Sequence, residues 1–190
     1  MDVNRYVSQS ELERQRQIAE EIYLENESRN LLCFVETFGC QMNVRDSETI
    51  KGELVDMGYS EACCKEEADL ILFNTCCVRD HAEKRLMGNI GALKELKDDK
   101  PGLIIGICGC MMQQEGMAKK LLKRFPHVSL IFGTSVLYRL PEMMQSVMNG
   151  DRISVTDRSD DAIAEGLPQM RDNPRSAFVN IMYGCNNFCS

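Results

Sequence analysis

The amino-acid sequence predicts an α/β fold, in which a mainly parallel open sheet carries helices on both of its faces. The first observation is that apolar runs of about four to eight residues recur along the chain. The second is that a helical pattern follows each run. This alternation occurs four times, which is typical of right-handed crossovers between parallel strands. With 44% apolar residues, the chain can also build a packed core.

Four segments are expected to form the strands of this sheet. Each is continuously apolar rather than alternating, which is the pattern of a strand that is buried on both faces. The first three read LLCFVETFGC, ADLILFNTC and GLIIGICGC, and each of them ends in a cysteine. The four segments are 31–40, 68–76, 102–110 and 127–134.

A helix is expected after each strand, because apolar residues recur there with helical spacing. In the segment 46–59, Ile50, Leu54 and Met57 share one face, and Gly58 marks the end of the helix. The corresponding residues are Ala82, Leu86, Ile90 and Leu93 in 79–97, and Met117, Leu121 and Phe125 in 113–125. The fourth helix is expected at 137–150.

The pattern divides the chain into four regions. Residues 1–30 are expected to form a polar helical extension with a thin apolar stripe, in a solvated or loosely docked position. Residues 31–150 form the N-terminal domain. Residues 151–175 lack clear periodicity and contain two prolines, so they are interpreted as a linker. Residues 176–190 begin a new strand, the opening of a second and truncated domain.

The charge balance is acidic, with 22 basic and 29 acidic side chains and a net charge of −7. Such a chain is a poor nucleic-acid binder by itself, because phosphate contacts require Lys and Arg. The first residues lack the apolar segment of a signal peptide, and no apolar run approaches the ~20 residues of a membrane span. We therefore expect a cytoplasmic protein without a membrane partner.

Ten cysteines carry most of the chemical information. In a reducing cytosol they indicate metal binding or catalysis rather than disulfides. Cys40, Cys76 and Cys110 stand at equivalent places of the strand–helix repeat, at the ends of three successive strands. Open parallel sheets bind ligands at the carboxyl ends of their strands, so these three thiols should converge there. The alternative is that each packs in the core as a small apolar residue.

The number of these thiols indicates the kind of site. A structural zinc site usually has four protein ligands, and this chain contains no CxxC pair. Three thiolates instead leave one corner of a cubane iron–sulfur cluster open. Cys108 would face the same side of its strand as Cys110, so it is a candidate to line the site. The cysteines at 33, 63, 64 and 77 are interpreted as core or surface residues.

Several motifs follow one another in a specific order. They are GCQMN at 39–43, DSE at 46–48, NTCCVRDHAEKR at 74–85, IIGICGCMMQQEG at 104–116 and IFGT at 131–134. Together they resemble the tRNA methylthiotransferases, and the terminal GCNNFCS resembles the start of the CxxxCxxC motif of radical-SAM enzymes. GCQMN and NTCCVR look most like the branch that acts on isopentenyladenosine beside the anticodon.

This resemblance implies two [4Fe–4S] clusters and S-adenosylmethionine as cofactors. Cys40, Cys76 and Cys110 match the three ligands of the auxiliary cluster. Cys185 and Cys189 match the first two ligands of the radical-SAM cluster, whose third ligand would follow Ser190. Residues 176–190 would then be only the first strand of a truncated radical-SAM barrel, and this chain alone is expected to be inactive.

The reaction that the resemblance implies is the transfer of a methylthio group to isopentenyladenosine in tRNA. Flavodoxin or ferredoxin would be the reducing partner, and tRNA would bind through C-terminal regions beyond this chain. The cofactors supply the difficult chemistry, so no catalytic acid or base is assigned to a side chain.

Asn43, Thr75 and Arg79 lie within a few residues of the matched cysteines and are candidates to hydrogen-bond or electrostatically stabilise the cofactor. For Arg79 the alternative is an ordinary solvent-facing arginine. Three other functions stay open. They are an iron–sulfur electron-transfer or metal-binding module, a methylthiotransferase acting on a ribosomal protein or threonylcarbamoyladenosine, and an α/β domain whose cysteines are only structural.

Overall fold

The computed structural model describes residues 6–77, 82–156, 163–171, 173 and 175–178. Its centre is a six-stranded sheet of parallel strands, in the order β2-β1-β3-β4-β5-β6. The strands are β1 (Leu32–Phe38), β2 (Ser60–Glu61), β3 (Leu70–Thr75), β4 (Ile104–Gly109), β5 (Leu130–Phe132) and β6 (Ile153–Val155). The helices are α1 (Gln9–Asn26), α2 (Gln41–Asp56), α3 (Ala82–Asp99), α4 (Met117–Arg124) and α5 (Leu140–Met148), with short 3-10 helices η1 (Cys110–Gln113) and η2 (Thr134–Arg139).

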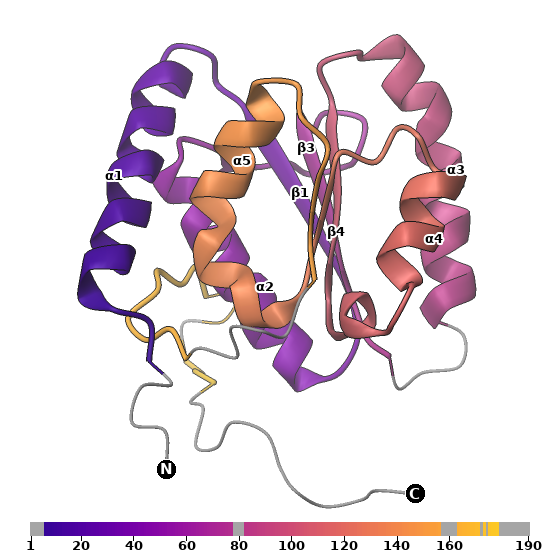
Figure 1. The fold of residues 1–190 in the computed structure, drawn as a ribbon. Helices are drawn as coiled ribbons and strands as arrows, with labels where there is room; N and C mark the ends of the chain where they lie inside the picture. The colour runs from indigo at the N-terminus through magenta and orange to yellow at the C-terminus, as the bar shows by residue number, and fades with distance from the viewer. Residues whose placement is uncertain (1–5, 78–81, 157–162, 172, 174, 179–190) are drawn as a thin grey trace, which may run out of the picture.

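Helices cover both faces of the sheet, which confirms the predicted fold class. Figure 1 shows α1, α2 and α5 on one side and α3 and α4 on the other. The central strand β3 supplies both cores, because successive side chains point to opposite faces. Leu70 and Leu72 pack with α1, α2 and α5, and Ile71 and Phe73 pack with α3 and α4. These four side chains are fully buried.

Two short edge strands differ from the sequence-based expectation. β2 has two residues and β6 has three, which is too short for an apolar pattern to be recognised. β6 lies within 151–175, where Ile153 pairs with Leu130 of β5. Part of the segment interpreted as a linker therefore belongs to the sheet. Most of the strand expected at 176–185 lies outside the described residues.

The N-terminal helix is packed rather than solvated or loosely docked, so that expectation is wrong. α1 lies against α5 and α2, and its apolar residues Leu12, Ile18, Ala19 and Ile22 are buried. Asn26 Nδ2 donates a hydrogen bond of 2.9 Å to the carbonyl of Met57 after α2. The stripe looked thin in the sequence because polar residues complete the buried face. Gln15 and Asn26 are 3% and 1% exposed.

Residues 163–170, here called the strap, also lie against this helical layer. The amide of Met170 donates to the carbonyl of Glu48 in α2 at 2.9 Å. Near the other end of the strap, the amide of Val7 donates to the carbonyl of Ile163 at 3.0 Å. Between them the strap crosses Gly52 closely, since a Cβ there would stand 2.6 Å from the carbonyl carbon of Pro168. The strap is thus docked on α2 and next to the start of α1.

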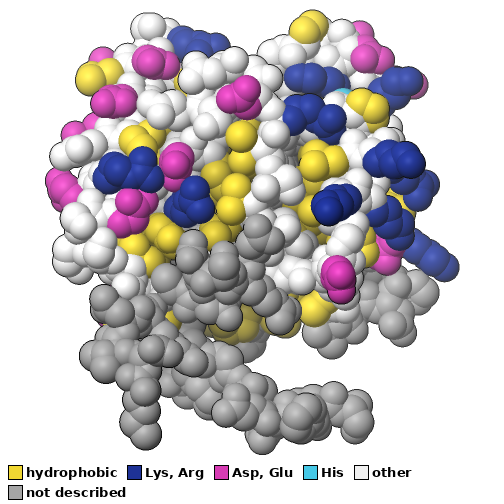
Figure 2. Space-filling view, in the orientation of Figure 1, with side chains coloured by type: hydrophobic (Ala, Val, Ile, Leu, Met, Phe, Trp, Pro, Cys, Tyr) yellow, Lys and Arg dark blue, Asp and Glu magenta, His cyan; other side chains and the backbone are white. Residues whose placement is uncertain are grey.

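The charged side chains are unevenly distributed over the surface. Figure 2 shows Lys and Arg gathered on the side of the molecule that α3 and α4 cover. Four of the eight residues of α4 are basic and none is acidic. The acidic net charge of the chain therefore conceals one basic helix. None of the described helices combines the length and the apolarity that crossing a membrane requires.

Candidate metal centre

The strand order places a topological switch point between β1 and β3. From β1 the chain adds β2 on one side, and then returns to add β3 on the other. The connections after β1 and β3 consequently leave in opposite directions, and the carboxyl ends of strands at such a point are where open parallel sheets bind ligands. The register aligns the ends of three strands there, because Phe38 pairs with Thr75 and Thr75 pairs with Gly109. Cys40, Cys76 and Cys110 follow these aligned ends within two residues.

Cys40 occupies the N-cap position of α2 and is held by Asn43. Asn43 Oδ1 accepts hydrogen bonds from the Cys40 amide at 3.3 Å and from the Cys40 thiol at 3.4 Å. The loop must be tight for this contact. A Cβ at Gly39 would lie 2.3 Å from Asn43 Oδ1. Only glycine therefore allows the backbone at position 39 to lie this close to the Asn43 side chain.

The amide of Asn43 joins this loop to β3. Its Nδ2 donates to Asn74 Oδ1 at 3.0 Å and to the Thr75 carbonyl at 3.1 Å. Asn74 in turn donates to the Asn43 carbonyl at 2.8 Å and to Ser47 Oγ at 3.0 Å. Asn74 and Thr75 are 0% exposed. Buried polar groups that are fully paired fix one arrangement, because any other leaves a donor or acceptor unsatisfied.

Cys110 is joined to the same carbonyl from the other side. Its Sγ lies 3.6 Å from the Thr75 carbonyl and accepts a hydrogen bond of 3.2 Å from the Cys77 amide. Cys76, between Thr75 and Cys77, is 2% exposed. The Thr75 carbonyl thus contacts both Cys110 and the Asn43 amide that holds Cys40. All three cysteine loops meet at one peptide group.

Gly109 turns the chain so that Cys110 reaches this position. Its φ is 104°, in the region that favours glycine. A Cβ on Gly109 would stand 2.3 Å from the Thr75 carbonyl oxygen. The glycine therefore allows β4 to end against β3 and η1 to begin at once with Cys110.

The surroundings of Cys110 favour its neutral thiol when no cation is present. Burial raises the pKa of Cys110 to about 12; the side chains of Cys77 and Cys76 add to this effect, and the Cys77 amide opposes it. A bound metal would reverse this preference, since a coordinating thiol is deprotonated by the charge of the metal. This environment therefore suits sulfur that is to be bound to a metal more than free thiolate.

A mononuclear metal ion and a cubane cluster require different arrangements of cysteine ligands. Among the described residues, no three His, Cys, Asp or Glu side chains are grouped closely enough to hold a single metal ion. A cubane cluster makes a different demand, because each thiolate binds a separate iron atom at its own corner. Three thiols on one sheet edge provide the soft donors that iron–sulfur clusters use. The donor chemistry of the three thiols therefore fits an iron–sulfur cluster.

The structure links Cys40 through Asn43 to the Thr75 carbonyl, and Cys110 contacts the same carbonyl. Cys76 follows Thr75 directly. Arg79, Cys185 and Cys189 lie outside the described residues. The interpretation of Cys108 as a lining residue is wrong. Its side chain is 1% exposed in the core under α1, α2 and α5, and it differs in direction from Cys110 because the Gly109 turn ends the strand between them.

The structure adds three residues to the site that the sequence motifs do not identify. Asn74 and Ser47 belong to the hydrogen-bonded network, and Cys77 contacts Cys110. The sequence does indicate a role for Asn74, because a polar residue at the end of an otherwise apolar strand needs a buried hydrogen-bond partner. Cys33 is buried in the core, whereas Cys63 is exposed.

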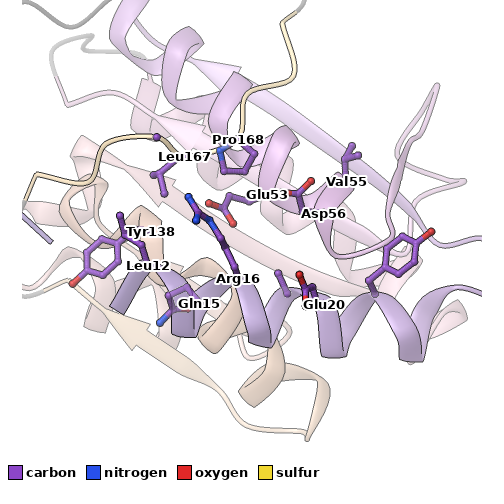
Figure 3. A pocket seen from close by; sticks show the side chains of 13 residues that line it. Leu12, Gln15, Arg16, Glu20, Glu53, Val55, Asp56, Tyr138, Leu167 and Pro168 are labelled. Carbon is purple, nitrogen blue, oxygen red and sulfur yellow. The ribbon is translucent and has the colours of Figure 1, made fainter. Parts of the chain in front are cut away.

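A separate cavity of about 530 Å³ lies on the helical layer, between α1, α2 and the strap. Figure 3 shows Arg16 of α1 extending into it, with Glu53 and Asp56 of α2 on its far side. Leu167 and Pro168 of the strap form another wall. None of the residues that line it is a cysteine, so this cavity and the thiol site are separate features.

Comparison with known proteins extends over nearly the whole chain. Residues 32–133 match the family described as Uncharacterized protein family UPF0004. A protein of Alkaliphilus oremlandii named tRNA-2-methylthio-N(6)-dimethylallyladenosine synthase is 49% identical over 186 residues, which are 97% of this chain and 39% of the relative. Proteins of the same name from Caldicellulosiruptor saccharolyticus and Thermoanaerobacter sp. are 52% and 44% identical. The two matched regions cover 90% and 100% of this chain, and 36% and 41% of the lengths of the relatives.

The chain spans about two fifths of the length of these curated relatives. The Thermoanaerobacter match includes all of this chain, so α1 and the strap fall within the similarity. These matches confirm the resemblance to the tRNA methylthiotransferases that the cysteine motifs indicate, and the chain belongs to Uncharacterized protein family UPF0004.

Proposed function

We propose that this chain is the part of a tRNA 2-methylthio-adenosine synthase that holds the auxiliary [4Fe–4S] cluster on Cys40, Cys76 and Cys110. The observation that carries the proposal is the aligned register of Phe38, Thr75 and Gly109, which brings the three cysteine loops to the same end of the sheet. The Thr75 carbonyl contacts two of these loops and belongs to the third. Relatives named as such synthases support the substrate.

The chain's own residues would position the cluster ligands. Asn43 holds the Cys40 loop, and Thr75 Oγ1 donates to the Cys108 carbonyl at 2.9 Å, which fixes β4 beside β3. The Cys77 amide, which donates to Cys110 Sγ, would stabilise an anionic sulfur there. Arg79 would add a positive charge near the site.

The bound cofactors would supply the one-electron chemistry and the sulfur that side chains lack. Cys185 and Cys189 would be the first two ligands of a radical-SAM cluster, with S-adenosylmethionine as co-substrate and a flavodoxin or ferredoxin as reductant. The target would be isopentenyladenosine beside the tRNA anticodon, in the cytoplasm. Since the chain spans only part of its relatives, these activities are proposed for a protein of the relatives' full length.

The test uses a protein of the relatives' full length that contains this chain, reconstituted anaerobically with iron and sulfide. We expect 2-methylthio-adenosine in tRNA treated with this protein, detected by mass spectrometry of the released nucleosides. Cys76→Ala should abolish the product, because it removes one thiolate ligand of the auxiliary cluster. The exposed Cys63→Ala variant is the matched control and should retain activity. A redox-active cluster without any methylthio product would instead support an electron-transfer module.

A further inference from the structure

Cys77 is a fourth thiol at the site, and the proposed ligand set does not use it. Its side chain is exposed, and it follows Cys76 directly. The Cys77 amide donates to Cys110 Sγ at 3.2 Å. An exposed cysteine is thus in contact, through its backbone amide, with a half-buried thiol that is proposed to bind iron.

The other thiols of the site are arranged differently. Cys76 is 2% exposed, so an oxidant in solution reaches Cys77 more easily than its neighbour. Cys40 is exposed, but its thiol hydrogen-bonds to Asn43 Oδ1. Cys110 is held towards Cys77 by the Cys77 amide and by the short turn at Gly109. Accessibility and contact therefore single out one pair.

We propose that Cys77 and Cys110 form a reversible disulfide when the site holds no cluster. The disulfide would prevent further oxidation of Cys110, and it would block assembly of the cluster until it is reduced. The role of Cys110 as a ligand rests on the proposed function, whereas the disulfide itself does not.

The oxidant that we assign is a peroxide. Sulfur of Cys77 attacks one peroxide oxygen, the O–O bond breaks, and Cys77 becomes a sulfenic acid while water leaves. Sulfur of Cys110 then attacks Cys77 Sγ, and the S–O bond breaks with release of a second water. Two thiols lose two electrons and two protons, and hydrogen peroxide is reduced to two molecules of water. A dithiol reductant reverses the result by disulfide exchange.

The first experiment maps disulfides in the cluster-free chain. Reduced protein is treated with hydrogen peroxide, free thiols are blocked by alkylation, and tryptic peptides are analysed by tandem mass spectrometry. Cleavage after Lys65 and Arg79 leaves Cys76 and Cys77 on one peptide, so fragment ions and the Cys76→Ser and Cys77→Ser variants must assign the bond. We expect a Cys77–Cys110 link that persists in Cys76→Ser and disappears in Cys77→Ser. A link from Cys110 to Cys76 or Cys40, or Cys110 alkylated as a free thiol, would overturn the proposal.

The second experiment measures recovery. Parent and Cys77→Ser proteins are oxidised with peroxide, reduced with dithiothreitol, and then supplied anaerobically with iron and sulfide. We expect the parent to regain the iron uptake of unoxidised protein and Cys77→Ser to lose most of it, because Cys110 without its partner proceeds to the irreversible sulfinic acid. Cys63→Ser should recover like the parent. Equal recovery of the parent and Cys77→Ser would refute the protective role. No iron uptake by unoxidised parent would contradict the proposed function, while the peptide map would still decide the disulfide.

Discussion

Glu53 is a carboxyl group in an environment that opposes its charge. It is 6% exposed and lines the cavity between α1 and α2. Burial raises its pKa to about 8, and the negative charge of Asp56 adds to this effect, while Arg16 opposes it. Figure 3 shows Arg16 and Glu53 facing each other across the cavity. The guanidinium is therefore not sufficient to compensate the lost hydration of the carboxylate.

This residue makes stability depend on pH. Because the folded pKa lies above the ordinary glutamate value of 4.5, the folded state binds the Glu53 proton more tightly than the unfolded state. Its contribution is complete below the unfolded pKa and is lost as pH rises towards 8. We expect the free energy of unfolding to fall between pH 5.5 and 7.5, by at most about 1.4 kcal/mol per pH unit from this group. Urea unfolding of the parent and of Glu53→Gln across this pH range measures the loss. If the free energy of unfolding changes with pH equally in both proteins, Glu53 is not its cause.

Single residues of the thiol site could be predicted where their place in the repeat determines them. Cys40, Cys76 and Cys110 follow strand ends, and parallel strands bring those ends to one edge. Cys108 could not be placed by the same rule, because the left-handed turn at Gly109 breaks the strand period. Cys77 also escaped prediction, since only the fold shows that its amide reaches a cysteine on the next strand.

Among the secondary-structure elements, α2 is packed on one side against the sheet and covered on its polar side by the strap. The sequence predicts the apolar face of α2 correctly, with Ile50, Leu54 and Met57 buried. It does not predict that Glu48 and Glu53 on the same helix are buried as well. Periodicity reports only which side of a helix is apolar, whereas the covering of the polar side by a distant segment depends on tertiary structure.

The contact between Gly52 and the strap gives a prediction with a matched control. In Gly52→Ala, a Cβ would stand 2.6 Å from the Pro168 carbonyl carbon. At Gly88 in α3, no heavy atom of the described residues comes within 4 Å of the added Cβ. Both substitutions gain about 0.5 to 1 kcal/mol of helix propensity, but Gly52→Ala must displace backbone, which costs about 1 to 3 kcal/mol.

We expect Gly88→Ala to be more stable than the parent and Gly52→Ala to be less stable, as measured by denaturant unfolding. Hydrogen exchange of the Met170 amide, which bonds to Glu48, should also become faster in Gly52→Ala alone. If both variants are stabilised equally and Met170 keeps its protection, the strap does not depend on Gly52.

The whole molecule shows why its fold class could be read from the sequence while its edges could not. Four long apolar runs, each followed by a helix, specify a parallel sheet with two helical layers. β2 and β6 contribute only two and three residues, and their pairing is defined by the neighbouring strands. The switch point between β1 and β3 also depends on the edge position of β2, so only the fold reveals it.

In the function that we propose, three thiols from separate loops bind one cubane cluster and leave one iron without a protein ligand. The most direct measurement is the Mössbauer spectrum of this chain after anaerobic reconstitution with iron-57, together with its iron and sulfide content. We expect about four irons per chain, one of them spectroscopically distinct and selectively shifted by added thiolate. We also expect loss of the cluster in each of Cys40→Ala, Cys76→Ala and Cys110→Ala, but not in Cys63→Ala. Four equivalent irons, or a cluster that survives removal of any of the three thiols, would contradict it.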